Sequence, residues 1–103
     1  MDKRQALGFA KIFSDRIVKE YNPINIYLFG SYAKDTWNDD SDIDIAVVFE
    51  KIQTNRLIIA KKLFKLRREI EPSLEPVVFD SRYDPSGFLE QIRKEGIQLF
   101  PAD

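Results

Sequence analysis

The sequence predicts an α+β domain of two layers, in which helices flank a small mixed β-sheet. Helical and strand-like segments alternate along the chain, which is the main observation behind this prediction. Apolar residues recur every three or four positions, as in amphipathic helices, over 2–21, 54–70 and 86–95. Short apolar runs bounded by turn formers, as in strands, lie at 24–29, 42–49, 74–79 and 97–100. With 103 residues, 44% of them hydrophobic, residues 1–103 are expected to form a single domain around one core.

The first half of the chain predicts a helix, a strand, a short turn and a second strand. The apolar stripe of the first helix consists of Leu7, Ala10, Phe13, Ile17 and Tyr21. Asn22–Pro23 ends that helix, and the strand 24–29 is broken by Gly30–Ser31. A helical turn is expected over 31–37 and a loop over 38–41, ahead of the β-branched strand 42–49.

The second half predicts two further helices with strands after them. Thr54 or Asn55 is the expected cap of a long helix, whose stripe is Ile59, Leu63, Leu66 and Ile70 and which Pro72 closes. Pro76 marks the strand 74–79 as irregular or as a sheet edge. After a loop over 80–84, Pro85–Ser86 opens the final helix, and Gly96 fits the C′ position after its end.

The composition excludes several kinds of chemistry. The chain has no cysteine and no histidine, so zinc–thiolate sites, cysteine nucleophiles and histidine bases are excluded. Its 16 basic and 17 acidic residues leave a net charge of −1, so a global basic field for nucleic acid is absent. No apolar run reaches the ~20 residues that cross a bilayer, and no membrane association is expected. A soluble cytoplasmic protein is the expectation.

The stretch Gly30 to Asp44 (GSYAKDTWNDDSDID) carries the chemistry. Asp42 and Asp44 are two positions apart on a strand, so both carboxylates point to one face. They repel unless a cation lies between them, and Mg²⁺ prefers such oxygen ligands together with phosphates. Two ions roughly 3.5–4 Å apart are the usual clamp for displacement at phosphorus. A solvated acidic strand edge is the simpler alternative for an isolated Asp-x-Asp.

Gly30 and Ser31 stand where a strand turns into a short helix, a place where amides and a hydroxyl can hold a phosphate. An ordinary turn is the alternative reading. If the two strands pair antiparallel, the end of the first at Gly30 lies beside the start of the second at Asp42. The phosphate cradle and the carboxylates would then share one pocket.

Gly-Ser, ten residues and Asp-x-Asp resemble the signature of the DNA polymerase β-like nucleotidyltransferase superfamily, and in particular its small minimal nucleotidyltransferases (MNT proteins). LEPVVFD and FLEQIRKEGIQLF resemble the third core strand and the C-terminal helix and strand of that fold. The resemblance implies that Gly30 and Ser31 hold the triphosphate, that Asp42 and Asp44 bind Mg²⁺, and that Glu75 is a third carboxylate and the base.

Some positions depart from the family pattern. Glu75 stands where Asp is more usual, Asp35 where Gly is common, and Tyr32 where Arg is common. Lys34 is then the nearest cation for the phosphates, unless it is a solvated loop lysine. Asp80 is the rival of Glu75, but it lies at the far end of its strand and an odd number of positions away, hence on the other face.

The resemblance implies a Mg²⁺-dependent enzyme that transfers a nucleoside monophosphate, AMP from ATP, to a hydroxyl group. After this core no room is expected for a second substrate domain, so a protein partner is the expected acceptor. The family resemblance implies a helical HEPN toxin, of which this chain would be the antitoxin, modifying a toxin tyrosine.

Two other functions stay open. In one, the chain is a binding module that neutralises its partner by contact. Alternatively it modifies RNA ends, using a basic stripe at helical spacing that comprises Lys61, Lys65 and Arg68, with Lys62 and Arg67 nearby. Such a stripe is more often a solvated helix face. Tyr32 and Trp37 border the expected site, where they would stack on a base or pack in the core.

Overall fold

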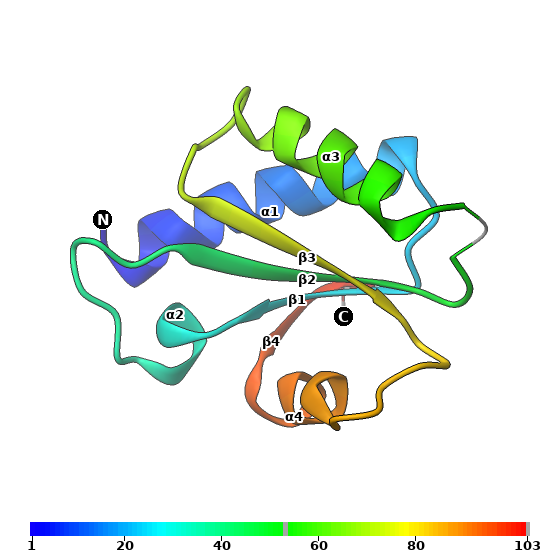
Figure 1. The fold of residues 1–103 in the computed structure, drawn as a ribbon. Coiled ribbons are helices and arrows are strands. Elements are labelled where there is room, and N and C mark those ends of the chain that lie inside the picture. The colour runs from blue at the N-terminus through cyan, green and yellow to red at the C-terminus, as the bar shows by residue number, and fades with distance from the viewer. Residues whose placement is uncertain (53, 103) are drawn as a thin grey trace.

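The computed structural model describes residues 1–52 and 54–102 and confirms the α+β class (Figure 1). The helices are α1 (Lys3–Glu20), α2 (Ser31–Lys34), α3 (Arg56–Arg67) and α4 (Phe88–Glu95). The strands are β1 (Asn25–Phe29), β2 (Ile43–Phe49), β3 (Leu74–Asp80) and β4 (Ile97–Phe100). Among the described residues, no helix combines the length and the apolar character that crossing a bilayer requires.

The strands form one mixed sheet in the order β3-β2-β1-β4. β1 runs antiparallel to both β2 and β4, whereas β2 and β3 are parallel. Helix α3 makes the crossover that a parallel connection needs. Pro76 lies in β3, an edge strand, which confirms the edge expected from that proline, since a central strand would need its missing N–H.

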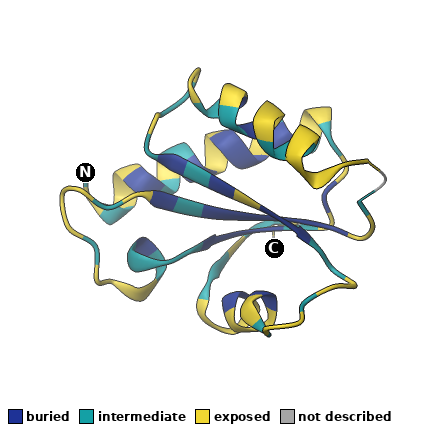
Figure 2. Cartoon of the chain, in the orientation of Figure 1, coloured by how far each residue is buried: buried dark blue, intermediate teal, exposed yellow. Residues whose placement is uncertain are grey.

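The two faces of the sheet are covered differently. Helices α1 and α3 lie together on one face, where Phe13, Ile17, Leu63 and Leu66 pack on the inward residues of β1, β2 and β3 (Figure 1). On the other face the buried cluster is smaller, and α4 contributes Leu89 and Ile92 to it. The sheet is mostly buried between these layers, while the outer sides of the helices are exposed (Figure 2).

Side-chain caps set the starts of α1 and α3. The Asp2 carboxylate accepts from Gln5 N, and Gln5 Oε1 accepts in return from Asp2 N, which forms a capping box. Asn55 accepts from Leu57 N at 2.8 Å, so of the two expected caps of α3 it is Asn55 that acts. Each pair satisfies amide groups that the helix itself leaves free.

Three expected helix ends are wrong. α2 ends at Lys34 because Asp35 adopts the left-handed conformation (φ 62°), and α3 ends at Arg67 rather than Ile70. α4 begins at Phe88, after a turn that includes Pro85 and Ser86. The Asp84 carboxylate accepts from Leu89 N and Glu90 N, each at 3.0 Å, and Ser86 Oγ accepts from Phe88 N at 3.3 Å, so most of the capping comes from Asp84, before the turn.

Gly96 is required for a reason other than the expected C′ role. Its φ of −80° is not left-handed, and it is the C-cap itself. A Cβ at Gly96 would lie 2.7 Å from Ile92 O and 2.9 Å from Leu28 O, below ordinary contact distance. The absent side chain thus lets the end of α4 approach β1 closely.

Candidate nucleotidyl-transfer site

The turn between β1 and α2 brings Gly30 against Asp44. Phe29, the last residue of β1, is paired in register with Asp44 of β2, which confirms the expected antiparallel pairing. A Cβ at Gly30 would collide with Asp44 Oδ2, and the backbone there has φ 74° and ψ −151°, a region that only glycine adopts readily. Glycine therefore lets the Asp44 carboxylate lie against the backbone of the turn.

Two more carboxylates flank Asp44 on the same face of the sheet. Asp42 is exposed and precedes β2, two positions before Asp44. Glu75 is half-buried and is the register partner of Asp44 in parallel β3. Residues paired in register share a face, and residues two apart do so as well. Three acidic residues thus lie near the amino ends of two neighbouring strands.

The neighbouring carboxylates and burial change the pKa of Asp44. Burial, the charge of Asp42 and the charge of Glu75 together raise the pKa of Asp44 from 3.8 to about 6, burial contributing most. The Asp44 carboxylate is thus held, half-buried, next to two other acids. Such an arrangement favours binding of a positive ion.

Glu75 is turned toward helix α3 by Arg67. Glu75 Oε1 lies 3.7 Å from Arg67 Nη1. The same guanidinium donates to Pro72 O and Leu74 O at 2.6 and 3.1 Å and lies 4.8 Å from the centroid of the Phe64 ring. Within residues 1–52 and 54–102, no three acidic side chains are close enough to hold one ion. The carboxylates therefore share a face without converging on a point.

Arg67 is the site residue that the sequence-based interpretation misplaced. The sequence placed it only near the basic stripe and gave it no role at the site, but it is half-buried against β3. The helical period carried the signal: Arg67 follows the buried Leu63 by one turn and so lies on the inward side. Because arginine is charged, the sequence pattern did not indicate that its side chain lies on the inward side of the helix. Lys61, Lys62, Lys65 and Arg68 are exposed as expected.

The donor set suits a hard divalent cation. Carboxylate oxygens are the ligands that Mg²⁺ selects, and Mg²⁺ sites commonly use one or two carboxylates plus phosphate oxygens. Asp42 and Asp44 supply such a pair, and the charges of Asp42 and Glu75 add to burial in raising the pKa of Asp44. The residues present therefore fit Mg²⁺.

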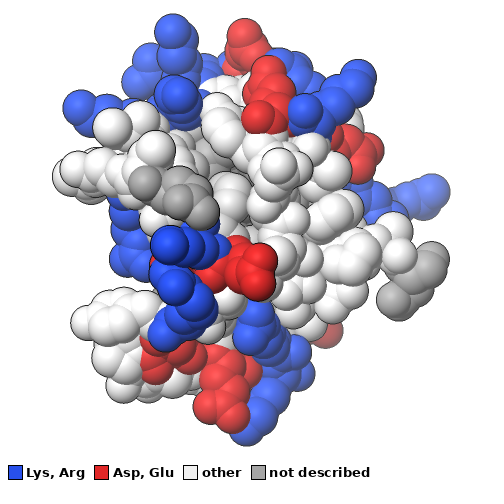
Figure 3. Space-filling view, turned by 90° about the vertical axis from the view of Figure 1, so that its right-hand side faces the viewer, with Lys and Arg blue, Asp and Glu red and all other residues white. Residues whose placement is uncertain are grey.

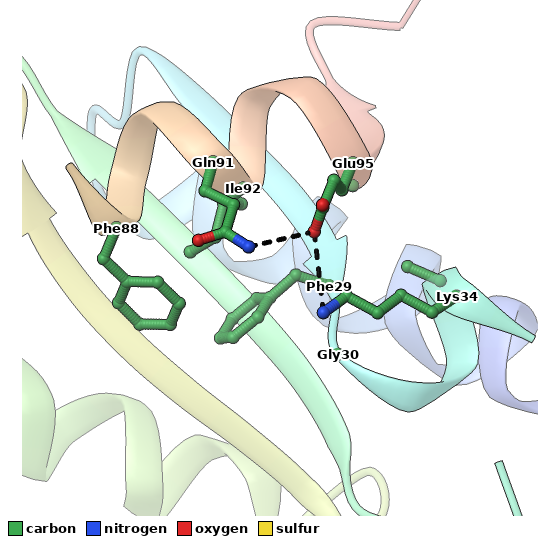
Figure 4. Close-up of a pocket in the computed structure, with 9 residues that line it drawn as sticks. Phe29, Gly30, Lys34, Phe88, Gln91, Ile92 and Glu95 are labelled. Carbon is green, nitrogen blue, oxygen red and sulfur yellow. Dashed lines mark hydrogen bonds and ion pairs between the residues drawn. The ribbon is translucent and has the colours of Figure 1, made fainter. Parts of the chain in front are cut away.

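Ser31 and Lys34 lie on α2, directly after the Gly30 turn. Ser31 is the first residue of that helix and is half-buried. Lys34 is its last residue, and its ammonium lies 3.5 Å from Glu95 Oε2 of α4. In this structure Lys34 thus bridges α2 to α4 across a cavity of about 230 Å³ (Figure 4).

Asp80 and Tyr32 lie outside this arrangement. Asp80 is opposite Phe49 at the carboxyl end of β3, where it accepts from the backbone N–H groups of Arg82 and Ile52 and pairs with the Arg82 side chain. The Arg82 bonds foremost lower the pKa of Asp80. Tyr32 is fully buried and stacks on Trp37 at 5.7 Å, so it has the packing role rather than the base-stacking one.

A profile of the family "Polymerase beta, Nucleotidyltransferase" matches residues 14–103. The chain belongs to this nucleotidyltransferase family. The match covers β1, α2, β2 and β3, the elements that carry the site, and it confirms the resemblance found in the sequence. The superfamily generally uses a divalent metal such as Mg²⁺. No curated protein matches the chain by sequence.

Solved structures agree with the family. A Sulfolobus solfataricus protein described as a candidate nucleotidyltransferase has a TM-score of 0.64 and 25% identity, over 93% of this chain and 80% of its own. A toxin–antitoxin structure with AMP-PNP has a TM-score of 0.62 and 28% identity, over 90% of this chain and 74% of its own. A mutant MntA–HpeT toxin–antitoxin structure has two aspartates changed to glutamate. It has a TM-score of 0.61 and 26% identity, over 90% of this chain and 74% of its own. The chain is thus related to a protein of MntA toxin–antitoxin structures.

Proposed function

We propose that this nucleotidyltransferase domain transfers AMP from ATP to a hydroxyl group of a protein partner. The observation that carries the proposal is the Asp44 carboxylate, wedged against Gly30 beside two further acids in a chain of this family. Electrostatic stabilisation and positioning would supply most of the rate, as in other phosphoryl transfers. The acceptor oxygen forms a bond to the α-phosphorus, the bond from that phosphorus to the β-bridging oxygen breaks, and pyrophosphate leaves.

The chain's own residues would have separate roles. Gly30 and Ser31 would hold the triphosphate, with Lys34 as the nearest cation once it leaves Glu95. Asp42 and Asp44, with Glu75, would hold Mg²⁺, which when bound neutralises charge on the phosphates. Glu75 would accept the proton of the acceptor hydroxyl. In this structure Glu75 pairs with Arg67, so Glu75 would have to leave Arg67 to take this role.

The neighbouring structures guide the choice of partner. Two of them are toxin–antitoxin assemblies, and one of these contains AMP-PNP, an ATP analogue. We therefore propose that the partner is a helical toxin of the HEPN type and that the acceptor is a tyrosine hydroxyl. This chain would then be the antitoxin.

Intact mass spectrometry tests the reaction. The co-purified partner is incubated with this chain, Mg²⁺ and each nucleoside triphosphate in turn. We expect the partner to gain the mass of one or more nucleoside monophosphates with ATP. The double variant Asp42→Asn, Asp44→Asn should lose this product.

The same variant separates catalysis from contact. If the partner is still neutralised by the double variant and is never modified by the wild-type chain, contact suffices and the transferase proposal is wrong. An Asp40→Asn variant changes an exposed loop carboxylate and should modify the partner as the wild type does.

A further inference from the structure

A cavity between α2 and α4 opens beside the proposed site. It has a volume of about 230 Å³, and Gly30, Lys34, Phe29, Phe88, Gln91 and Glu95 contribute to its lining (Figure 4). We propose that this cavity receives the base of the nucleoside triphosphate and that Gln91 makes adenine the preferred base. The inference rests on the proposed function, because it assumes that the triphosphate lies at the Gly30 turn.

The position and size of the cavity suit a base. Gly30 belongs both to the cavity lining and to the contact with Asp44, so the cavity and the carboxylates adjoin through one residue. Pockets for whole drug-sized ligands measure roughly 300–1,000 Å³. The smaller cavity matches one ring system, with the sugar and phosphates outside it toward Asp44.

Aromatic side chains form one wall of the cavity. Phe88 is 45% exposed although it starts the helix that packs on the sheet. Its ring meets those of Phe29 and Phe79 in edge-to-face contacts, with centroids 5.7 and 5.8 Å apart. These contacts hold the Phe88 ring in place and leave much of it accessible. A base can stack on such a ring whatever its identity.

Polar groups on the rim favour adenine. Gln91 Nε2 donates to Glu95 Oε2 at 3.4 Å, and Lys34 Nζ lies 3.5 Å from the same oxygen (Figure 4). A glutamine amide offers a donor and an acceptor, the pair that matches adenine, whereas guanine O6 and N7 are matched by a cation. Within residues 1–52 and 54–102, Lys34 is the lysine of the cavity lining, and it is paired with Glu95. Glu95 therefore acts as a positioning residue for Gln91.

Calorimetric binding of AMP-PNP and GMP-PNP with Mg²⁺ tests the assignment. We expect wild-type protein to bind AMP-PNP more tightly. Phe88→Ala should weaken both analogues about tenfold, the effect of losing an aromatic stack. Gln91→Leu should weaken AMP-PNP about tenfold and leave GMP-PNP unchanged, so the preference disappears.

Control variants separate effects on folding from effects on nucleotide binding. Tyr83→Ala removes an aromatic ring that is 66% exposed and outside the cavity lining, and it should change neither affinity; melting curves check that each variant folds. If Asp44→Asn weakens binding but Phe88→Ala and Gln91→Leu do not, the cavity assignment is wrong and the proposed function stands. If GMP-PNP binds as tightly as AMP-PNP, the adenine preference is wrong. If neither analogue binds, both proposals fail.

Discussion

Gly30 is the residue whose missing side chain shapes the site. The Asp44 carboxylate occupies the space that a Cβ would need, and the backbone angles at Gly30 are open only to glycine. Gly87 has nearly the same φ, 76°, but nothing lies within 4 Å of the position of its Cβ. Gly87, with ψ 11°, therefore carries left-handed strain alone, whereas Gly30, with ψ −151°, combines a backbone region open only to glycine with steric exclusion.

Alanine at each glycine measures the two effects. Gly87→Ala should cost about 1–2 kcal/mol in the free energy of unfolding, from left-handed strain alone. Gly30→Ala should cost about 1–3 kcal/mol more, because its backbone angles are open only to glycine and its methyl group displaces Asp44. Urea denaturation of both variants gives the comparison. Equal losses would mean that neither the backbone angles at Gly30 nor its contact with Asp44 adds a cost.

Asp44 makes the stability of the metal-free protein depend on pH. Its pKa is about 6 in the folded chain against 3.8 ordinarily. Between these values the folded state binds more protons than the unfolded state, so stability falls as pH rises from about 4 to about 6 and stays lower above that. Below pH 4 the carboxyl is protonated in both states and contributes no difference.

Asp44→Asn should remove this penalty. In EDTA at pH 7.5 the variant should be more stable than wild type by about 1–2 kcal/mol, after allowing for solvent screening. At pH 4 the two proteins should differ little. Thermal or urea unfolding across this range checks the sign. A variant that is destabilised at pH 7.5 would show that Asp44 is stabilised by its surroundings.

At the scale of elements, Arg67 joins α3 to the edge strand β3. Its guanidinium reaches two backbone carbonyls, the Glu75 carboxylate and the Phe64 ring. Its Nε is buried and has no hydrogen-bond partner within the described part of the chain, a cost that the other contacts offset. Arg68, the next residue, is exposed.

Arg67→Ala should destabilise the fold by about 1–2 kcal/mol, because the Pro72 and Leu74 carbonyls and the Glu75 carboxylate lose their donor. Arg68→Ala should stay within about 0.5 kcal/mol of wild type. Guanidinium unfolding of both variants measures the difference. Equal effects would mean that the contacts of Arg67 contribute no more than an exposed side chain does.

At the scale of the whole molecule, the sheet is covered unevenly. α1 and α3 seal one face, whereas α4 contributes only Leu89 and Ile92 to a smaller cluster on the other, where the acidic residues lie. Basic side chains gather over the top of the molecule, on the side of α1 and α3 (Figure 3). The acidic site and the basic surface of α3 thus lie on different sides of the sheet.

Ligand binding on the face of the sheet that α4 covers should stabilise the whole domain. AMP-PNP with Mg²⁺ at a hundred times its Kd should add about 2.7 kcal/mol, which raises the Tm of a domain of this size by roughly 10 °C or more. EDTA should reverse most of the shift, and Asp42→Asn, Asp44→Asn should abolish it. A shift that survives EDTA would indicate nucleotide binding without the metal.

Local sequence patterns were sufficient to predict most of the helices and strands and to find the Gly-Ser and Asp-x-Asp motif. Hydrophobic spacing predicted every strand, and alternation on β2 put Asp42 and Asp44 on one face. Helix ends were less predictable, because the start of α4 depends on Asp84, several residues upstream. Nothing in the spacing around Pro85–Ser86 indicates that bond.

The amino-acid sequence by itself determined the α+β class, the order of the elements and the acidic motif, since each depends on residues close together in the chain. Tertiary structure alone decided that Arg67 turns Glu75 toward α3 and that Phe88, Gln91 and Glu95 border a cavity beside Gly30. Those contacts join elements distant in sequence, and strand register together with helix packing sets which side chains meet.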